Sequence, residues 1–161
     1  MRKNLLFIPG PVTVPEPVLA AMSAPLIDHR GPQFAALVKR IDHSLRSIFG
    51  TKRGEIVLLG SSGTGGLEAA VTSSFSPGDS VLAAPVGVFG RRLIAIAKTY
   101  GLCVDVIETE PGRALDPDAL AERLNGEVNP RYTGVLLTHN ETSTGVQNDM
   151  ARIASVVRNH G

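Results

Sequence analysis

Apolar residues along this chain recur with two different spacings, one typical of helices and one typical of buried strands. From Phe34 onward they follow three-and-four spacing, which places them on one face of a helix that ends near Gly50. Beyond Gly54, short apolar runs alternate with further segments of helical spacing. The runs predict strands over residues 56–59, 80–84, 103–107 and 135–138.

Two of the helices predicted between these strands have clear start signals. Asp116 is a typical N-cap, and Pro117 follows it at the first helical position, where proline is favoured. The last helix begins after Asn148 or Asp149, and either side chain can cap it. Two earlier helices are predicted from the apolar spacing alone, over residues 67–75 and 89–100.

Strands that are apolar throughout and separated by helices indicate a mainly parallel sheet with helices on both faces. The predicted fold class is therefore α/β, in one domain over residues 1–161. Prolines at positions 9, 11, 15 and 17 predict an extended N-terminal arm rather than a helix, because proline fixes its own φ and restricts the residue before it. The sheet is expected to be incomplete, because in this alternating pattern the final helix leads into another strand.

Composition, charge and cysteine content indicate a soluble globular protein and exclude several other classes. The 43% apolar and 19% charged residues are those of a soluble globular protein, and a formal charge of +1 favours neither nucleic acid nor a membrane as partner. Cys103 is the only cysteine, is expected in the core, and excludes an internal disulfide. No Cys or His cluster has the spacing of a metal site. Because the start of the chain resembles neither a signal peptide nor a membrane span, we expect a cytoplasmic protein.

The densest chemical signal is the glycine-rich segment GSSGTGGLE at residues 60–68, between a predicted strand and a predicted helix. Such a turn presents backbone N–H groups and the positive end of a helix dipole to a phosphate. The nucleotide P-loop motif is not met, because Gly66 stands where it requires lysine. The dinucleotide motif fails at Glu68, where its third glycine would stand. Two interpretations stay open here, a phosphate site and a tight structural turn.

Six motifs together resemble, in order and spacing, those of class V aminotransferases, and most closely those of alanine–glyoxylate and serine–glyoxylate transaminases. The resemblance covers nearly the whole chain, and its most specific part lies at residues 139–146. The motifs are PGPV at residues 9–12, DHR at 28–30, SGTG at 62–65, SPGD at 76–79, GVFGR at 87–91 and HNETSTGV at 139–146.

This resemblance implies a fold-type I enzyme that depends on pyridoxal 5′-phosphate (PLP) and is usually a homodimer with active sites at the subunit interface. Its small-molecule substrates would be an amino acid and a 2-oxo acid, an amino group passing from alanine or serine to glyoxylate. Residues 1–161 would then be the N-terminal arm and the first part of the large, PLP-binding domain. The rest of that domain and the small C-terminal domain would follow Gly161.

The resemblance also implies cofactor-binding residues. Ser62, Gly63, Thr64 and Gly65 match the turn that holds the cofactor phosphate, in agreement with the phosphate interpretation above. Phe89 matches the position at which the family places an aromatic ring against the pyridine ring of PLP, where offset stacking would fix the cofactor plane. Taken from the residues alone, Phe89 also fits the core face of an amphipathic helix.

Two further positions carry predicted roles by resemblance. Thr142 matches a residue whose hydroxyl lies near the phenolic oxygen of the cofactor, although a threonine at a strand end also commonly caps local backbone. Gly10 matches an arm segment that lines the substrate pocket, although an ordinary turn between prolines would also explain it. Glu141, Ser143 and Gly145 are expected to shape their loop rather than to react.

No catalytic residue is identifiable in the chain. The lysine that forms the Schiff base with PLP, and the acidic partner of the pyridinium nitrogen, are expected beyond Gly161. The chain is therefore expected to be inactive alone, as the front portion of an aminotransferase. A non-catalytic subunit or remnant that binds a phosphate ligand or docks onto a partner is a competing hypothesis. A ureidoglycine–glyoxylate transaminase and a cysteine-desulfurase-like enzyme stay open as well, because substrate choice depends on residues outside this sequence.

Overall fold

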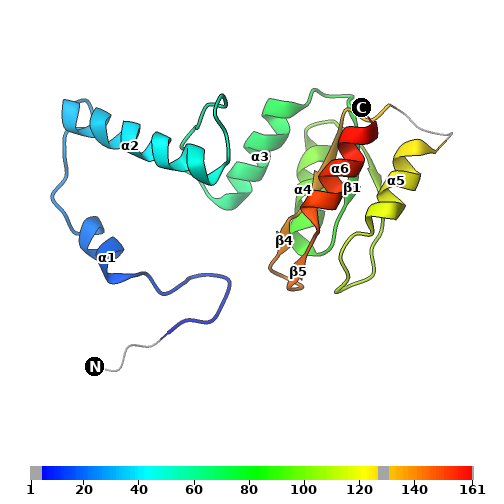
Figure 1. Cartoon of the computed structure of the whole chain (residues 1–161), viewed down its shortest axis with the longest axis horizontal. Coiled ribbons are helices and arrows are strands. Elements are labelled where there is room, and N and C mark those ends of the chain that lie inside the picture. The colour runs from blue at the N-terminus through cyan, green and yellow to red at the C-terminus, as the bar shows by residue number, and fades with distance from the viewer. Residues whose placement is uncertain (1–4, 127–130, 161) are drawn as a thin grey trace. The chain divides into compact units, whose positions relative to one another are not determined.

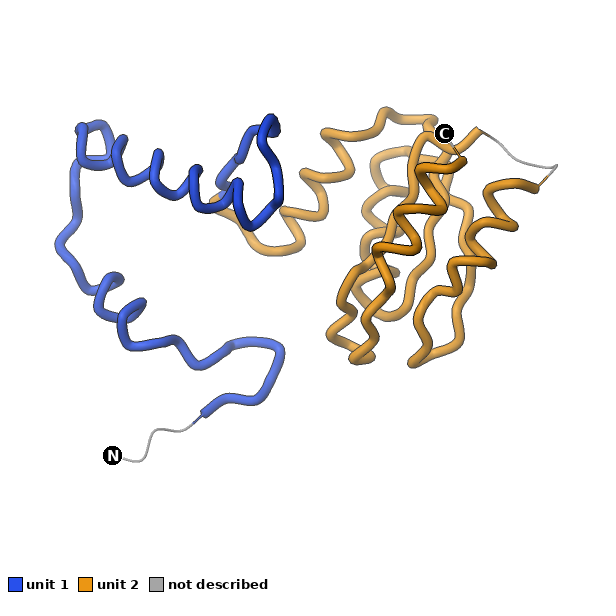
Figure 2. The backbone as a smooth tube through the Cα atoms, in the orientation of Figure 1, with its two compact units in different colours: residues 1–59 blue, residues 60–161 orange. Residues whose placement is uncertain are grey.

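The computed structural model describes residues 5–126 and 131–160 of the chain (Figure 1). The chain divides into two compact units, Met1–Leu59 and Gly60–Gly161 (Figure 2). In the described ranges, unit 1 holds two helices, and unit 2 holds a parallel sheet with helices on both of its faces.

Unit 1 contains α1 (Glu16–Met22) and α2 (Pro32–Ile48). α2 confirms the helix predicted from the apolar spacing, and Gly50 follows it with φ +62°, a left-handed conformation that favours glycine. The prediction of an arm without a helix is wrong over α1. Pro15 is the N-cap of α1 and Pro17 lies in its first turn, where the missing proline N–H is not needed by the helix.

The strand predicted over residues 56–59 is also wrong. The run lies outside any strand, and Val57, Leu58 and Leu59 are exposed. A strand requires a neighbour that exchanges backbone hydrogen bonds with it. Within the part of the chain that the structure describes, no strand pairing includes this run, so its apolar composition alone does not make it a strand.

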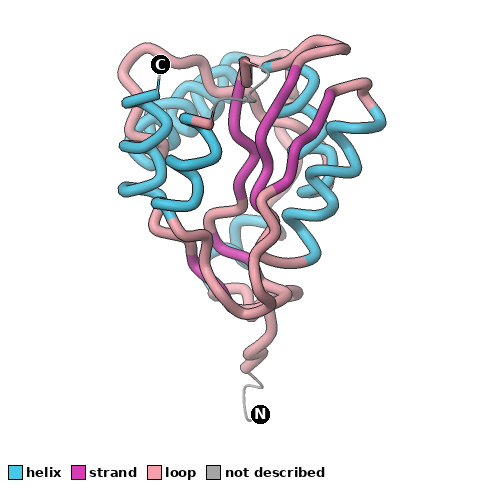
Figure 3. The backbone as a smooth tube through the Cα atoms, turned by 90° about the vertical axis from the view of Figure 1, so that its right-hand side faces the viewer, coloured by secondary structure: helices cyan, strands magenta, loops and turns pink. Residues whose placement is uncertain are grey.

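The sheet of unit 2 has three parallel strands in the order β2-β1-β3. Their bounds are Cys103–Val106 for β2, Ser80–Ala84 for β1 and Gly134–Leu137 for β3. Figure 3 shows helices on both sides of the strands. The predicted α/β class and the parallel sheet are confirmed.

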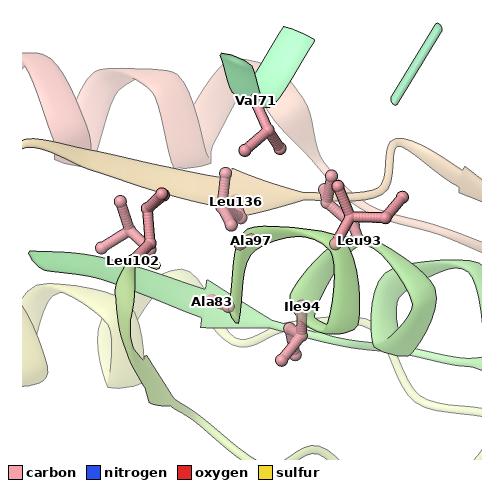
Figure 4. Packing of buried hydrophobic residues seen from close by; sticks show 9 residues of the cluster. Val71, Ala83, Leu93, Ile94, Ala97, Leu102 and Leu136 are labelled. Carbon is pink, nitrogen blue, oxygen red and sulfur yellow. The ribbon is translucent and has the colours of Figure 1, made fainter. Parts of the chain in front are cut away.

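Alternate residues of β1 face opposite sides of the sheet, and each side is covered by its own pair of helices. Val81 and Ala83 belong to a cluster with residues of α3 (Gly63–Ser74) and α4 (Val88–Thr99), part of which is shown in Figure 4. Leu82 and Ala84 belong to a second cluster with residues of α5 (Pro117–Asn125) and α6 (Met150–His160). Because all four of these β1 side chains are fully buried, β1 is the centre of the unit.

The predicted starts of α5 and α6 are confirmed, and one of the two residues that could cap α6 is identified as its N-cap. Asp116 is the N-cap of α5 and accepts a hydrogen bond from the Asp118 N–H at 2.9 Å. Asp149, rather than Asn148, performs this role for α6, accepting from the Arg152 N–H at 3.1 Å. Asn148 is buried instead, where its amide bridges the backbone groups of Leu115 and Thr138 at 2.8 Å each.

A short antiparallel hairpin joins β3 to α6. It consists of β4 (Asn140–Glu141) and β5 (Val146–Gln147). The turn between them closes through a 2.8 Å hydrogen bond from the Gly145 N–H to the Glu141 carbonyl, with Gly145 at φ +73°. This turn lies within the segment that carries the most specific motif of the sequence.

Cys103 is exposed, so the prediction that it lies in the core is wrong. It begins β2, which is an edge strand of the sheet, and the apolar run around it does not determine which of its residues are covered. Among residues 5–126 and 131–160, no helix is long and apolar enough to cross a membrane.

Candidate functional site

A cavity of about 510 Å³ lies within unit 2, where β3 ends and α3 and α4 begin. This is the carboxyl edge of the parallel strands, the usual place for ligands in open α/β sheets. Apolar and polar side chains both reach it. The lining residues are Ser62, Gly63, Thr64, Leu67, Phe89, Arg92, Leu93, Leu137, Thr138 and His139.

The first turn of α3 forms one wall of this cavity. Ser62 is the N-cap, and its Oγ accepts a hydrogen bond from the Gly65 N–H at 3.3 Å. The N–H groups of the first turn of a helix have no acceptor within the helix and carry its positive dipole end. Ser62 gives this end an uncharged cap, so the wall favours an anion in the cavity.

The glycines of this turn serve different purposes. A Cβ on Gly65 would fall 2.0 Å from Ser61 Oγ, so a larger residue forces Ser61 to move. A Cβ on Gly63 would meet nothing within 4 Å. Gly65 is therefore set by packing within the turn, whereas the open space at Gly63 leaves its backbone accessible from the cavity.

Arg92 supplies a positive charge to the cavity, and no role for it was predicted from the sequence. Its Nη1 donates to Thr64 Oγ1 at 3.2 Å, and its guanidinium carbon lies 5.2 Å from the centroid of the Phe89 ring. A usable signal was present, because Arg92 follows Phe89 by three residues and so shares its helix face. The adjacent Arg91 instead pairs with Glu108 at 2.9 Å.

Phe89 lines the cavity as a partly exposed ring. Its exposed fraction is 38%, and it belongs to neither of the two apolar clusters. The interpretation of Phe89 as a core residue therefore does not describe its position. Its ring is held by the first turn of α4 and covered by Arg92.

Glu141 lies behind this wall as a buried carboxylate with an exposed fraction of 1%. Oε2 accepts from the N–H groups of Phe89 at 3.0 Å and Gly90 at 3.1 Å, and Oε1 accepts from the N–H and hydroxyl of Ser143 at 3.1 and 2.6 Å. Burial raises the pKa of Glu141, but these hydrogen bonds outweigh it, so the pKa lies below the usual glutamate value. Glu141 and Ser143 thus shape this loop.

The remaining predicted residues, Thr142 and Gly10, are not among the lining residues of the cavity. Thr142 is exposed in the turn between β4 and β5 and is not a lining residue. Gly10 belongs to unit 1, ahead of a cis peptide bond to Pro11. The roles predicted for both stay predictions. His139 does line the cavity; it begins the motif at residues 139–146, but no role was predicted for it individually.

Nothing in the described ranges points to a metal centre at this site. Among residues 5–126 and 131–160, no three His, Cys, Asp or Glu side chains are grouped so that they could hold a metal ion. The cavity places the N-terminal turn of α3 beside an aromatic ring and an arginine.

An α/β unit with a glycine-rich helix start and an aromatic ring at the edge of its sheet fits the family that the motifs indicate. The chain belongs to the class V aminotransferase family, which it matches over residues 6–161.

Two curated relatives and one solved structure illustrate the similarity. The chain is 39% identical, over 159 residues, to a protein of Anabaena cylindrica named soluble hydrogenase 42 kDa subunit, covering 99% of this chain and 41% of that one. It is 39% identical over 151 residues to L-aspartate–glyoxylate aminotransferase of Paracoccus denitrificans, and the match covers 94% of this chain and 38% of that protein. The structure of alanine–glyoxylate aminotransferase from Nostoc sp. matches with a TM-score of 0.89 and 31% identity, and the match covers 100% of this chain and 42% of that one.

The chain therefore spans about two fifths of the length of these relatives, as the coverages of 41%, 38% and 42% show. This extent agrees with the prediction that residues 1–161 correspond to the front portion of an aminotransferase.

Proposed function

We propose that this chain supplies the phosphate-binding and ring-binding walls of a PLP site in an aminotransferase. The observation that carries the proposal is that one cavity is lined both by the first turn of α3 and by the Phe89 ring. PLP combines a phosphate with a flat aromatic ring, so it needs these two kinds of surface within the length of one small molecule.

The residues present fit the phosphate of PLP. A phosphate dianion is stabilised by helix N-terminal N–H groups and by a cation that can donate two hydrogen bonds. The α3 turn of Ser62, Gly63 and Thr64 offers the helix N-terminal N–H groups. Arg92, which is hydrogen-bonded to Thr64, offers the cation. Gly65 keeps this turn compact.

The N-terminus of α4 does not compete for the phosphate. Its first N–H groups already donate to the carboxylate of Glu141 and to Ser143 Oγ. Among the described residues, the side chain that caps the N-terminal end of α3 is that of Ser62, a neutral hydroxyl. Since one helix end already holds an internal anion, an external anion is directed to the other.

When bound, PLP supplies an electron sink that allows an amino acid to give its amino group to a 2-oxo acid. The chain's own contribution is to hold the phosphate at Ser62, Gly63, Thr64 and Gly65 and to hold the ring plane at Phe89. Thr142 would place its hydroxyl near the phenolic oxygen, and Gly10 would line the substrate pocket. These two roles follow from the family resemblance.

Transfer of an amino group to glyoxylate is the reaction we propose for the whole protein, with alanine or serine as donor. Glyoxylate is the substrate that the names of two similar proteins share, whereas their named donors, aspartate and alanine, differ. We further propose that the whole protein is a homodimer, as the family resemblance implies, and that it is located in the cytoplasm.

Residues 1–161 by themselves are proposed to be inactive. Transamination requires a lysine that bonds to the cofactor and moves its proton. The lysines in the described ranges are Lys39, Lys52 and Lys98, and none of them is a lining residue of the cavity.

The proposal is tested by assaying the protein expressed from its own gene, beside the isolated 161 residues, with PLP, glyoxylate and each of alanine, serine, aspartate and ureidoglycine. We expect PLP-dependent formation of glycine by the gene product with at least one donor, and none by the isolated chain. A gene product that binds PLP and transfers no amino group would favour the hypothesis of a non-catalytic subunit. One that binds no PLP would refute the proposed site.

A further inference from the structure

The N-terminus of α4 begins without a capping side chain of its own. Gly87 is its N-cap, and the first hydrogen bond within the helix runs from the Arg91 N–H to the Gly87 carbonyl at 3.1 Å. The three N–H groups before Arg91 therefore need acceptors from elsewhere.

All three of these N–H groups donate to the hairpin that lies more than fifty residues further along the chain. Val88 donates to Ser143 Oγ at 3.0 Å, and Phe89 and Gly90 donate to Glu141 Oε2 at 3.0 and 3.1 Å. A further bond, from Thr144 Oγ1 to the Val86 carbonyl at 3.0 Å, extends the same junction. The start of α4 and the β4–β5 turn are thereby joined at several points.

The two oxygens of the Glu141 carboxylate accept hydrogen bonds from different elements. Oε2 accepts both donors from α4, and Oε1 accepts both donors from Ser143 in the turn. A neutral glutamine of the same size cannot satisfy both pairs, because its amide nitrogen is a donor and not an acceptor. Only an ionised carboxylate serves the helix and the turn together.

Gly87 makes room for this carboxylate. Its backbone is extended, at φ 169°, so glycine is not required there by conformation. A Cβ on Gly87 would fall 2.4 Å from Glu141 Cγ and 2.5 Å from Ser143 Oγ. The glycine is explained by the close approach of the Glu141 side chain.

We propose that Glu141 is a positioning residue that fixes the first turn of α4, and with it the Phe89 ring of the ring-binding wall, against the neighbouring turn that carries Thr142. The placement of the ring depends on this contact because Phe89 lies outside both apolar clusters. Thr142 directly follows Glu141 and precedes Ser143, which the same carboxylate holds. The functional meaning of this alignment rests on the PLP site proposed above.

The test uses the protein expressed from its own gene, with 4-fluorophenylalanine placed at position 89, and compares Glu141→Gln with the wild type. The readouts are the ¹⁹F signal of residue 89, the affinity for PLP and the circular dichroism of bound PLP. Glu122→Gln is the matched control, because Glu122 is an exposed glutamate on α5. We expect Glu141→Gln to shift or broaden the ¹⁹F signal and to weaken PLP binding about tenfold, as the loss of hydrogen bonds to a charged group predicts.

Ser143→Ala provides a milder second variant, should Glu141→Gln fail to fold. It removes the hydroxyl that accepts from Val88 and donates to Glu141. We expect it too to shift or broaden the ¹⁹F signal of residue 89 and to weaken PLP binding. A lowered unfolding midpoint with an unchanged ¹⁹F signal would make Glu141 a purely structural residue and would overturn the inference. A shifted signal with unchanged PLP affinity would overturn it as well.

Failure of the proposed function gives a different result. If the wild-type protein binds no PLP, that function is refuted, and the ¹⁹F signal alone then decides whether Glu141 places the Phe89 ring.

Discussion

Arg92 lies over the ring of Phe89, with its guanidinium carbon 5.2 Å from the ring centroid, and the same guanidinium donates to Thr64 Oγ1 at 3.2 Å. One side chain of α4 therefore connects the ring-binding wall to the anion-binding end of α3. This arrangement matches the aromatic ring and the anionic phosphate of the proposed ligand, PLP.

Arg92→Gln should weaken PLP binding about tenfold, because it removes a charge-assisted donor to the phosphate while keeping a side chain of similar length. The matched control is Arg91→Gln, since Arg91 pairs with Glu108 and does not line the cavity. Fluorescence titration of each variant with PLP gives the two dissociation constants. Equal affinities for the two variants would exclude Arg92 from the phosphate site.

Phe89 should tolerate a change of aromatic ring better than loss of the ring. Phe89→Trp keeps a face for stacking, whereas Phe89→Leu removes it and should cost about 1 kcal/mol of PLP binding energy, the usual value of an aromatic pair beyond its buried area. Titration of both variants, with circular dichroism of the bound cofactor, measures the difference. If leucine and tryptophan retained PLP equally, stacking at this position would be refuted.

Thr64→Val tests the hydroxyl that lies between Arg92 and the α3 turn. We expect weaker retention of PLP, because a polar contact at the anion-binding turn is lost while the side-chain shape is kept. Thr72→Val is the control on the same helix, since the Thr72 hydroxyl bonds only backbone carbonyls of α3 and lies outside the lining. Retention is measured by dialysis against buffer without PLP, and unchanged retention in Thr64→Val would contradict this role for Thr64.

The lowered pKa of Glu141 predicts how stability depends on pH. Because its pKa is lower in the folded than in the unfolded protein, its contribution is fully present above the ordinary glutamate pKa and is lost as the pH falls through the folded value. The free energy of unfolding should therefore fall as the pH is lowered below the ordinary glutamate pKa, and less so in Glu141→Gln. Urea unfolding across this range measures the slope, and Glu122→Gln should retain that of the wild type. Identical slopes in Glu141→Gln and wild type would contradict the assignment.

Features that rest on local pattern were predictable from the sequence. The strand Ser80–Ala84 was predicted to the residue, because a central strand covered on both faces must be apolar throughout. The N-cap Asp116 was equally clear, because capping depends on neighbouring residues alone. The glycine-rich turn was predicted to lie at a helix start, and α3 begins at Gly63.

Features that depend on distant partners were not predictable in this way. Residues 56–59 have the composition of a strand, but pairing is decided by other segments of the chain. The four hydrogen bonds at Glu141 include two from residues about fifty positions earlier, which no local pattern encodes. The burial of Cys103 was mispredicted for a related reason, since the burial of an edge-strand residue depends on what covers that edge.

Binding of the PLP phosphate by the α3 turn can be measured with 4′-deoxypyridoxine 5′-phosphate. This analogue has the ring and phosphate of PLP but lacks the aldehyde, so it cannot react with lysines and reports on the non-covalent site alone. Isothermal titration calorimetry of the protein expressed from its own gene compares it with 4′-deoxypyridoxine, which lacks the phosphate. We expect the phosphorylated compound to bind about a hundredfold more tightly, because its phosphate would be held by a helix end and an arginine. Equal affinity for the two compounds, or no binding of either, would contradict it.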